Sequence, residues 1–206
     1  MQSEETKVDT EERIIMAALT VFARKGKDGA RMQEIADEAG INKAMLHYYF
    51  RSKDKLYEAV FRHVFNRFSA QHATAVKESP TFAKTLKLFI NGFIDSIREK
   101  PDIVRLMVNE NLSGGTALGN MIVEKQHEKA PPSILKRKLE EAIKNGEIRP
   151  VDPDHTLLTI LSCCLFFFIW APTIHIKIPK SKDWDAFIES RKEHIFDMVY
   201  NGLQPQ

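Results

Sequence analysis

The sequence has little cysteine, and this scarcity excludes a disulfide-stapled secreted domain. Its two cysteines, Cys163 and Cys164, are neighbours inside an apolar run and form no disulfide framework. A chain of 206 residues can bury well over half of its unfolded surface without such staples. The first residues are acidic and polar, unlike a signal peptide. We therefore expect a protein of the reducing cytoplasm.

The sequence also lacks an apolar run of the length that a membrane span requires. The run "TLLTILSCCLFFFIW" at 156–170 stops at Ala171-Pro172. It falls short of the roughly 20 apolar residues that a transmembrane helix needs. We expect a helix buried in a core or at a subunit interface, and no membrane partner.

The features of an enzyme or a metal protein are missing or incomplete. Glu124-x-x-His127 is half of a di-iron helix motif, and a second Glu-x-x-His is absent. No Gly-rich phosphate loop occurs, and His155, His175 and His194 have no nearby Ser or Cys arrangement that would suggest a nucleophile. We expect no enzyme activity, no metal and no cofactor.

Charge is unevenly distributed, although the formal net charge is only +2. Residues 1–12 hold five acidic residues against one lysine. Residues 24–55 hold eight Lys or Arg against five Asp or Glu, a local charge of +3. A local basic patch attracts a phosphate backbone even where the average charge is near zero.

Helical periodicity recurs along the whole chain, with no convincing strand alternation and no internal repeat. The pattern predicts an all-α fold with a small three-helix head and a larger helical body. The expected head helices lie at about 10–25, 32–39 and 42–49, and Gly26 ends the first of them. The expected body helices lie at about 52–79, 82–99, 102–112, 116–145 with a break at Pro131-Pro132, 154–170 and 183–202.

The stretch "GINKAMLHYYFRSKDKL" at 40–56 has the pattern of a helix-turn-helix, in which a glycine turn joins two short helices. Leu46 and Phe50 fall on one face and would anchor the second helix to the head. The opposite face could then meet a DNA groove, with Met45 against a thymine methyl group. The alternative is that the cations only solvate a surface and the tyrosines pack. The residues expected on this side are Lys43, Ala44, Met45, His47 and Tyr48, with Asn42 as the helix cap and Lys53 at the start of the next helix.

The longer stretch "LTVFARKGKDGARMQEIADEAGINKAMLHYYFRSKDKLYEAV" resembles the DNA-binding head of the tetracycline-repressor (TetR) family. The segment "NGEIRPVDP" at 145–153 and "YNGL" near the end are weaker matches to the family. The residues that carry the resemblance in the head are Phe22, Gly26, Ile35, Ala36, Ala39, Gly40, Ile41, Lys43, Leu46, Tyr49, Phe50, Ser52, Lys53 and Leu56.

The resemblance implies DNA-binding roles for individual residues, with some departures. Gln33 falls where a base-reading residue, often Arg, is found, and Gln can still read adenine. Ala30-Arg31 replaces a common Thr-Ser, so the hydroxyl cap is missing and Arg31 could contact phosphate by charge instead. His47 replaces the usual phosphate-binding tyrosine and would make binding more pH-sensitive if its charge matters. The DNA-binding set implied is Arg31, Gln33, Asn42, Lys43, Ala44, Met45, His47, Tyr48 and Lys53.

The resemblance also implies a division of labour along the chain. Residues 1–52 would bind DNA, with 1–9 disordered, and residues 53–206 would bind an effector and form a homodimer through the last two helices. A two-fold dimer would place its recognition helices in successive major grooves and read a palindrome. The alternative is that the last helix is only an intramolecular core. Its apolar residues near helical spacing are Phe187, Ile188, Ile195, Phe196 and Val199.

Apolar residues of the body could line a pocket for a small effector, although plain core is the alternative for each. Arg105, Glu110 and Asn111 could orient a ligand, with exposed surface as the alternative. The candidate pocket residues are Phe89, Phe93, Met107, Phe166 and Trp170.

The function expected is a TetR-like regulator, a repressor that leaves a palindromic operator when a small, apolar effector binds. The alternative is a helical effector- or partner-binding protein with weakened or lost DNA recognition. The sequence does not indicate the effector, the operator, the direction of regulation or the regulated genes.

Overall fold

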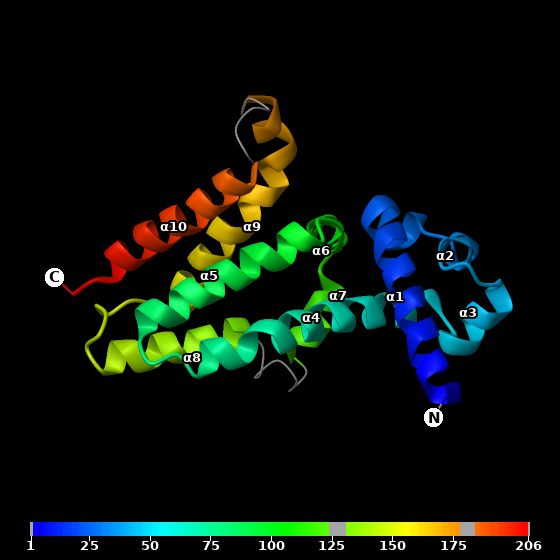
Figure 1. Ribbon diagram of the computed structural model, residues 1–206, viewed down its shortest axis with the longest axis horizontal. Helices are drawn as coiled ribbons and strands as arrows, with labels where there is room; N and C mark the ends of the chain where they lie inside the picture. The colour runs from blue at the N-terminus through cyan, green and yellow to red at the C-terminus, as the bar shows by residue number, and fades with distance from the viewer. Residues whose placement is uncertain (1, 124–130, 178–183, 206) are drawn as a thin grey trace. The chain divides into compact units, whose positions relative to one another are not determined.

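The computed structural model describes residues 2–123, 131–177 and 184–205, and the elements found among them are helices (Figure 1). The predicted all-α class is therefore confirmed. Glu124 and His127, the incomplete di-iron motif, lie outside the described residues. The helices are α1 (Gln2–Gly29), α2 (Met32–Glu38), α3 (Lys43–Tyr49), α4 (Lys53–Lys77), α5 (Phe82–Glu99), α6 (Asp102–Leu112), α7 (Thr116–Val123), α8 (Pro131–Lys144), α9 (Pro153–Lys177) and α10 (Trp184–Leu203).

The helices form two compact units. The first unit comprises Met1–Asn66 and Pro101–Lys125, and the second comprises Arg67–Lys100 and Gln126–Gln206. Helix α4 therefore contributes residues to both units. The first unit thus contains α6 and α7 in addition to the predicted head. The boundary expected at residue 52 divides the chain by function, and it stays a prediction.

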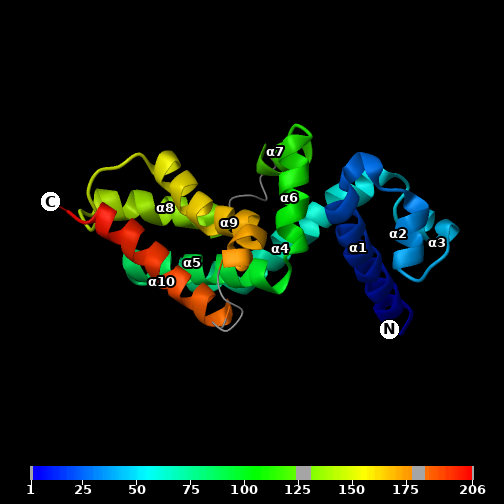
Figure 2. The ribbon, with the colours of Figure 1, turned by 90° about the horizontal axis from the view of Figure 1, so that it is seen from above.

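The first unit is built on α1, which packs against α2 and α6, while α2 packs against α3. Figures 1 and 2 both show α2 and α3 beside α1. The ring of Phe22 meets the ring of Tyr57 edge-on at 4.8 Å. Leu46 of α3 and Leu106 of α6 are fully buried in the same core. The apolar faces that the sequence predicts for these helices therefore pack against one another in one core.

The second unit is a bundle of α5, α8, α9 and α10, in which α5 contacts each of the other three. Figure 2 shows α10 crossing α5 in this bundle. The core gathers Leu86 and Ile90 of α5, Leu135 of α8, Ile160 of α9 and Ile188 of α10, all of them fully buried. Burial of these aliphatic side chains supplies the main driving force for the packing of this unit.

Helix α9 carries the apolar run. Its segment Pro153–Trp170 has a mean hydropathy of 1.5 and, by length and composition alone, could cross a membrane. Only 17% of that segment is buried inside the chain. Of the two places expected for it, a core or a subunit interface, the core holds only one side of α9, because the rest faces outward in a single chain. The large exposed residues on it are Leu158, Phe166, Ile169 and Trp170.

Two helix ends differ from the expectation. Helix α1 begins at Gln2 and not at about residue 10, so the structure has residues 2–9 as helix where disorder was expected. The cause is local, because 2–9 contain neither Gly nor Pro, and early acidic residues favour a helix N-terminus. Helix α9 continues past Pro172 to Lys177, because a proline removes one N–H without preventing the following residues from bonding.

Candidate nucleic-acid interface

The end of α1 fixes where the helix-turn-helix begins. Gly26 adopts φ 68° and ψ 172° within α1, a left-handed conformation that favours glycine. This break frees carbonyl groups of the preceding turn. The Asn109 side chain of α6 donates to the carbonyl oxygens of Ala23, at 3.0 Å, and Phe22, at 3.5 Å. The predicted stop at Gly26 is confirmed, and α6 satisfies the groups that the stop exposes.

Helix α2 is held by its buried face and by the turn that follows. Ile35 and Ala36 are buried, and Gly40 turns the chain with φ 65°. The N–H of Ile41 then donates to the Ala36 carbonyl at 3.0 Å. At the other end, the extended N-cap residue Arg31 makes no side-chain cap hydrogen bond. The missing hydroxyl cap that the sequence indicates is therefore a feature of the structure.

Helix α3 presents the two faces that its sequence predicts. The Asn42 side chain accepts the Met45 N–H at 2.8 Å and caps the helix. Leu46 and Phe50 are buried against the head core. On the other side, Tyr48 is 70% exposed and its ring meets Tyr49 edge-on at 5.5 Å. The DNA-contact role of this outward side stays a prediction. Its exposed residues are Lys43, Ala44, Met45, His47 and Tyr48.

Three cations of the basic region have acidic partners within the head. Arg24 and Lys25 both contact the Glu34 carboxylate, at 3.1 Å and 2.6 Å. The hydrogen bond from Lys25 lowers the pKa of Glu34, with a smaller contribution from Arg24. Lys27 contacts Asp54 at 3.0 Å. Two carboxylates thus offset two of these three positive charges, which reduces their contribution to a field outside the protein.

Four further cations of this region are exposed, and none has an ion pair with an acidic residue in the part of the chain that the structure describes. They are Arg31 before α2, Lys43 at the start of α3, Arg51 after α3 and Lys55 in the first turn of α4. Unpaired cations of this kind are available to phosphate groups. Arg51 and Lys55 were not among the expected contacts, although the local charge of this region includes them.

Two expected contact residues have partners inside the protein. The Gln33 side chain donates from Nε2 to the Asp37 carboxylate at 2.8 Å, so reading a base requires it to exchange this partner. The ammonium group of Lys53 donates to the carbonyl oxygens of Asp28 and Ala30, each at 3.3 Å. The Gln33 pairing has the i,i+4 spacing of a helix and was open to prediction, whereas the carbonyls that Lys53 contacts lie 25 and 23 residues away in sequence.

The expected pocket residues fall into separate groups. Phe89 is buried in the core and stacks with Phe93 at a centroid distance of 5.7 Å. Phe166 and Trp170 lie 6.0 Å apart and are 55% and 51% exposed. Met107 belongs to the first unit, and the four aromatic residues belong to the second. Their assignment to an effector pocket stays a prediction.

Glu110 is buried, so the expectation of an exposed surface residue is wrong for it. Its carboxylate accepts the Ala117 N–H at 2.6 Å and thereby caps the start of α7. Burial raises the pKa of Tyr57, and a hydrogen bond to Glu110 raises it further. This carboxylate therefore joins α4, α6 and α7 within the first unit. Arg105 and Asn111 are exposed, as expected.

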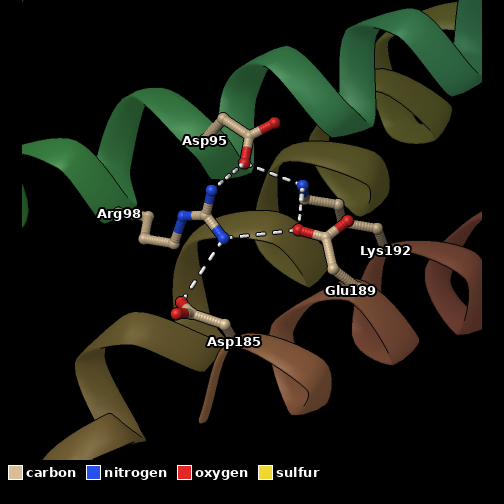
Figure 3. Close-up of polar contacts among 5 residues, drawn as sticks. All are labelled: Asp95, Arg98, Asp185, Glu189 and Lys192. Carbon is tan, nitrogen blue, oxygen red and sulfur yellow. Dashed lines mark hydrogen bonds and ion pairs between the residues drawn. The ribbon is translucent and has the colours of Figure 1, made fainter. Parts of the chain in front are cut away.

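A charged network between α5 and α10 was not foreseen from the sequence. The ammonium group of Lys192, only 5% exposed, contacts Asp95 at 2.7 Å and Glu189 at 2.8 Å. Arg98 contacts the same two carboxylates and Asp185 (Figure 3). The sequence spacing could have indicated that Lys192 is buried. Lys192 lies four residues after buried Ile188 and three before buried Ile195, and residues at these spacings share one face of a helix.

The segment at 145–153 ties together three helix ends of the second unit. The Glu147 carboxylate accepts the Phe82 N–H at 2.7 Å at the start of α5. At the end of α10, the backbone N–H of Arg149 donates to the Leu203 carbonyl, and its side-chain Nε–H donates to the Gly202 carbonyl. The Asp152 side chain accepts the His155 N–H at 2.8 Å at the start of α9. The segment "NGEIRPVDP" is thus a set of helix caps.

Two family models match the chain. Residues 14–60 match a family described as "Bacterial regulatory proteins, tetR family". Residues 83–199, more than half of the chain, match one described as "Tetracyclin repressor-like, C-terminal domain".

Curated relatives and solved structures agree with these matches. The chain is 26% identical over 200 residues to the HTH-type transcriptional regulator RutR of Escherichia coli (strain K12), covering 94% of this chain and 90% of RutR. It is 27% identical over 163 residues to the HTH-type transcriptional repressor NicS of Pseudomonas putida, covering 77% and 75%. The structure of HlyIIR, a hemolysin II transcriptional regulator, matches with a TM-score of 0.65 at 26% identity over 96% of this chain and 98% of that one. AibR in complex with isovaleryl coenzyme A and operator DNA matches with a TM-score of 0.72 at 21% identity, over 92% and 97%.

Proposed function

Because this chain belongs to the TetR family of bacterial transcriptional regulators, we propose that it represses transcription from a palindromic operator until a small, apolar effector binds its second unit. The protein is a helix-turn-helix transcriptional regulator that binds DNA. The observation that carries the finer proposal is the set of unpaired cations around the outward face of α3. Repression is supported by its similarity to the repressor NicS.

The proposed DNA contacts divide into two kinds. Lys43, Ala44 and Met45 at the start of α3 would reach base edges or the nearest phosphates. His47 and Tyr48 would donate to phosphate oxygens along the groove. Gln33 would read a base after leaving Asp37, and Arg31 would contact a phosphate at the start of α2. Asn42 would act by holding α3 in its helical form through its cap to Met45.

Salt titration of DNA binding tests these contacts. DNA from the region upstream of the gene should bind with an affinity that falls steeply as salt rises, since each phosphate contact contributes a slope of about 0.9 in log K against log salt. Replacing Lys43 and Tyr48 by alanine should weaken binding about 100-fold, because contacts of this kind are worth about 1–3 kcal/mol each. Wild-type binding that ignores salt, or a double variant that binds as well as wild type, would refute the mapping.

Selection from a random DNA pool separates this proposal from the alternative of lost DNA recognition. A repressor of this design should enrich one palindrome with half-sites about one helical turn apart. A pool that yields no enriched sequence supports instead a helical effector- or partner-binding protein.

We propose that dimerisation covers the exposed apolar side of α9 together with α10. Leu158, Phe166 and Trp170 expose more than half of their surface in a single chain, and Met198 of α10 is 67% exposed. Apolar patches of this kind are typical of subunit interfaces. A two-fold axis would then supply the two recognition helices that a palindrome requires. This use of Phe166 and Trp170 replaces their candidate place in the pocket.

The effector is proposed to be apolar because the second unit offers aromatic and aliphatic side chains around half-buried Phe93. AibR binds isovaleryl coenzyme A, so short acyl thioesters and the corresponding free acids are suitable first probes. An effector should raise the Kd for DNA at least about tenfold, a coupling of roughly 1–3 kcal/mol. Native mass spectrometry of freshly purified protein would reveal a co-purifying ligand and the dimer mass together. As a bacterial transcriptional regulator, the protein is proposed to act in the cytoplasm, where the DNA is, and to have no enzyme activity.

A further inference from the structure

The first turn of α4 and the end of α1 are joined by two bridges that run in opposite directions. Lys27 of α1 contacts the Asp54 carboxylate of α4 at 3.0 Å, and its ammonium group also lies 5.3 Å from the centre of the Tyr57 ring. Lys53 of α4 donates to the Asp28 and Ala30 carbonyls, each at 3.3 Å. The two helices therefore hold each other through side chains that are neighbours in sequence, Lys53 and Asp54.

The carbonyl of Ala30 lies immediately before Arg31, which is the N-cap of α2. Arg31 is extended, with φ −111° and ψ 138°, and its side chain makes no cap hydrogen bond. The first backbone hydrogen bond of α2 joins the Ile35 N–H to the Arg31 carbonyl at 3.2 Å. Without a hydroxyl cap, the conformation of this turn depends on the groups that bind its carbonyls.

We propose that Lys53 is a positioning residue that holds the turn between α1 and α2, so that Arg31, and not Lys53, contacts phosphate at this end of the interface. An ammonium group has three donors and no acceptor, and two of the three point at carbonyl oxygens of the turn. A buried or half-buried donor that serves such carbonyls is costly to withdraw. This inference rests on the proposed function, because it assigns the contacts of the same DNA interface.

The contacts of the Lys53 ammonium group with the Asp28 and Ala30 carbonyls are here called the brace. Hydrogen exchange of the protein without DNA tests whether the brace stabilises the turn. Replacing Lys53→Met should speed exchange of the Ile35 and Ala36 amides about tenfold, because local opening of the start of α2 becomes easier. Lys53→Arg should restore most of the protection, since a guanidinium can donate to both carbonyls. Lys55→Met is the matched control, because Lys55 is an exposed lysine of the same helical turn. It should leave the exchange of these amides unchanged.

DNA binding tests the division of roles between Lys53 and Arg31. Arg31→Gln, Lys55→Met and Lys53→Met should each reduce the salt slope by about 0.9, the last because it releases the phosphate contact of Arg31. In the Lys53→Met background, Arg31→Gln should have no further effect, while Lys43→Ala should keep its full effect. This selective loss of additivity indicates that Lys53 acts through Arg31.

The opposite results overturn the inference. Slope reductions that add to about 1.8 in the double variant Lys53→Met, Arg31→Gln would make Lys53 a phosphate ligand in its own right, whether or not exchange also changes. Unchanged exchange would remove the brace, and an undiminished Arg31→Gln effect would remove the link to Arg31. If Lys53→Met does not fold, as judged by its circular dichroism, Lys53→Ala gives the same comparison, because it also removes the donor. If wild-type protein binds no DNA, the proposed function fails, and the exchange measurement still decides whether Lys53 braces the turn.

Discussion

The two units differ in the surface that their candidate binding helices expose. In the first unit Ile35, Ala36 and Leu46 of α2 and α3 are buried, while Met45 and Tyr48 are exposed. Four cations of this region are exposed without ion pairs among the described residues. In the second unit the cations Lys87, Lys136 and Lys192 each contact a carboxylate. A group of exposed large apolar side chains lies there on α9: Leu158, Phe166, Ile169 and Trp170.

This difference indicates what each unit must meet outside itself. Unpaired cations gain little from another protein core but gain counterion release from a nucleic acid. Exposed Phe and Trp side chains gain from the removal of water by a second apolar surface. The partner of the first unit is therefore a polyanion, and the partner proposed for the second unit is another copy of the same helices. Both assignments follow from what each surface lacks.

The largest expected effect concerns the exposed apolar side chains of α9. Phe166→Glu should raise the dimer dissociation constant about 30-fold or more, because central aromatic residues of an interface are worth about 2 kcal/mol or more. Analytical ultracentrifugation measures this directly, and affinity for a palindrome should fall with it. Leu112→Glu is the control, because Leu112 is 82% exposed and lies in the first unit. Equal dissociation in both variants would contradict the assignment of α9 to the interface.

The next effect concerns the paired charges of the second unit. Lys192→Met should lower the free energy of unfolding by about 2 kcal/mol, because it leaves Asp95 and Glu189 without their buried partner. The value is below that of a fully buried pair, since these carboxylates are 34% and 57% exposed. Lys87→Met removes an exposed pair with Glu193 and should cost less than about 1 kcal/mol. Urea denaturation of the two variants decides, and equal costs would show that burial of Lys192 does not matter.

A smaller effect compares the unpaired and paired cations of the first unit. Arg51→Gln should weaken DNA binding about fivefold at 0.15 M salt and reduce the slope by about 0.9, as expected for one lost phosphate contact. Arg24→Gln should change the slope little, because Arg24 shares Glu34 with Lys25. Fluorescence anisotropy over a salt series measures both. If Arg24→Gln has the larger effect, local pairing is not what decides the use of these cations.

The features that were predictable from sequence are those encoded within a few residues. Gly26, the cap Asn42 and the spacing of Leu46 and Phe50 define the head, because each acts through its own helix or turn. The outward side of α3 follows from the inward side by geometry. This is why the fold class and the exposed face of the recognition helix agree with the expectation.

The features that were not predictable depend on partners distant in sequence. Glu110 was expected at the surface because acidic residues are rarely buried, yet it caps α7 and bonds Tyr57 of α4. Lys192 finds Asp95 on another helix. Exposure of α9 was hidden for a different reason, because an apolar run has the same composition in a core and in an interface. Only the packing of the chain separates these cases.

The smallest expected effect sharpens the contrast between the two sides of α9. Cys164 faces the bundle and is fully buried, whereas its neighbour Cys163 is partly exposed. Burial raises the pKa of the Cys164 thiol to about 12, with a smaller contribution from Cys163. Since the thiol of the unfolded chain loses its proton first, the stability contributed by this group is complete below about pH 9 and falls as pH rises toward 12.

The loss should be about 1 kcal/mol by pH 10, relative to a chain without this thiol. The measurement is the free energy of unfolding of wild type and Cys164→Ala between pH 7 and about 10. The alanine variant should be less stable at pH 7, because it leaves a small cavity, but its stability should decline less steeply with pH. Cys163→Ala is the matched control and should retain the wild-type decline. If Cys163→Ala flattens the curve and Cys164→Ala does not, the side of α9 that faces the bundle is the other one, and the apolar surface proposed for dimerisation would have to be drawn around Cys164.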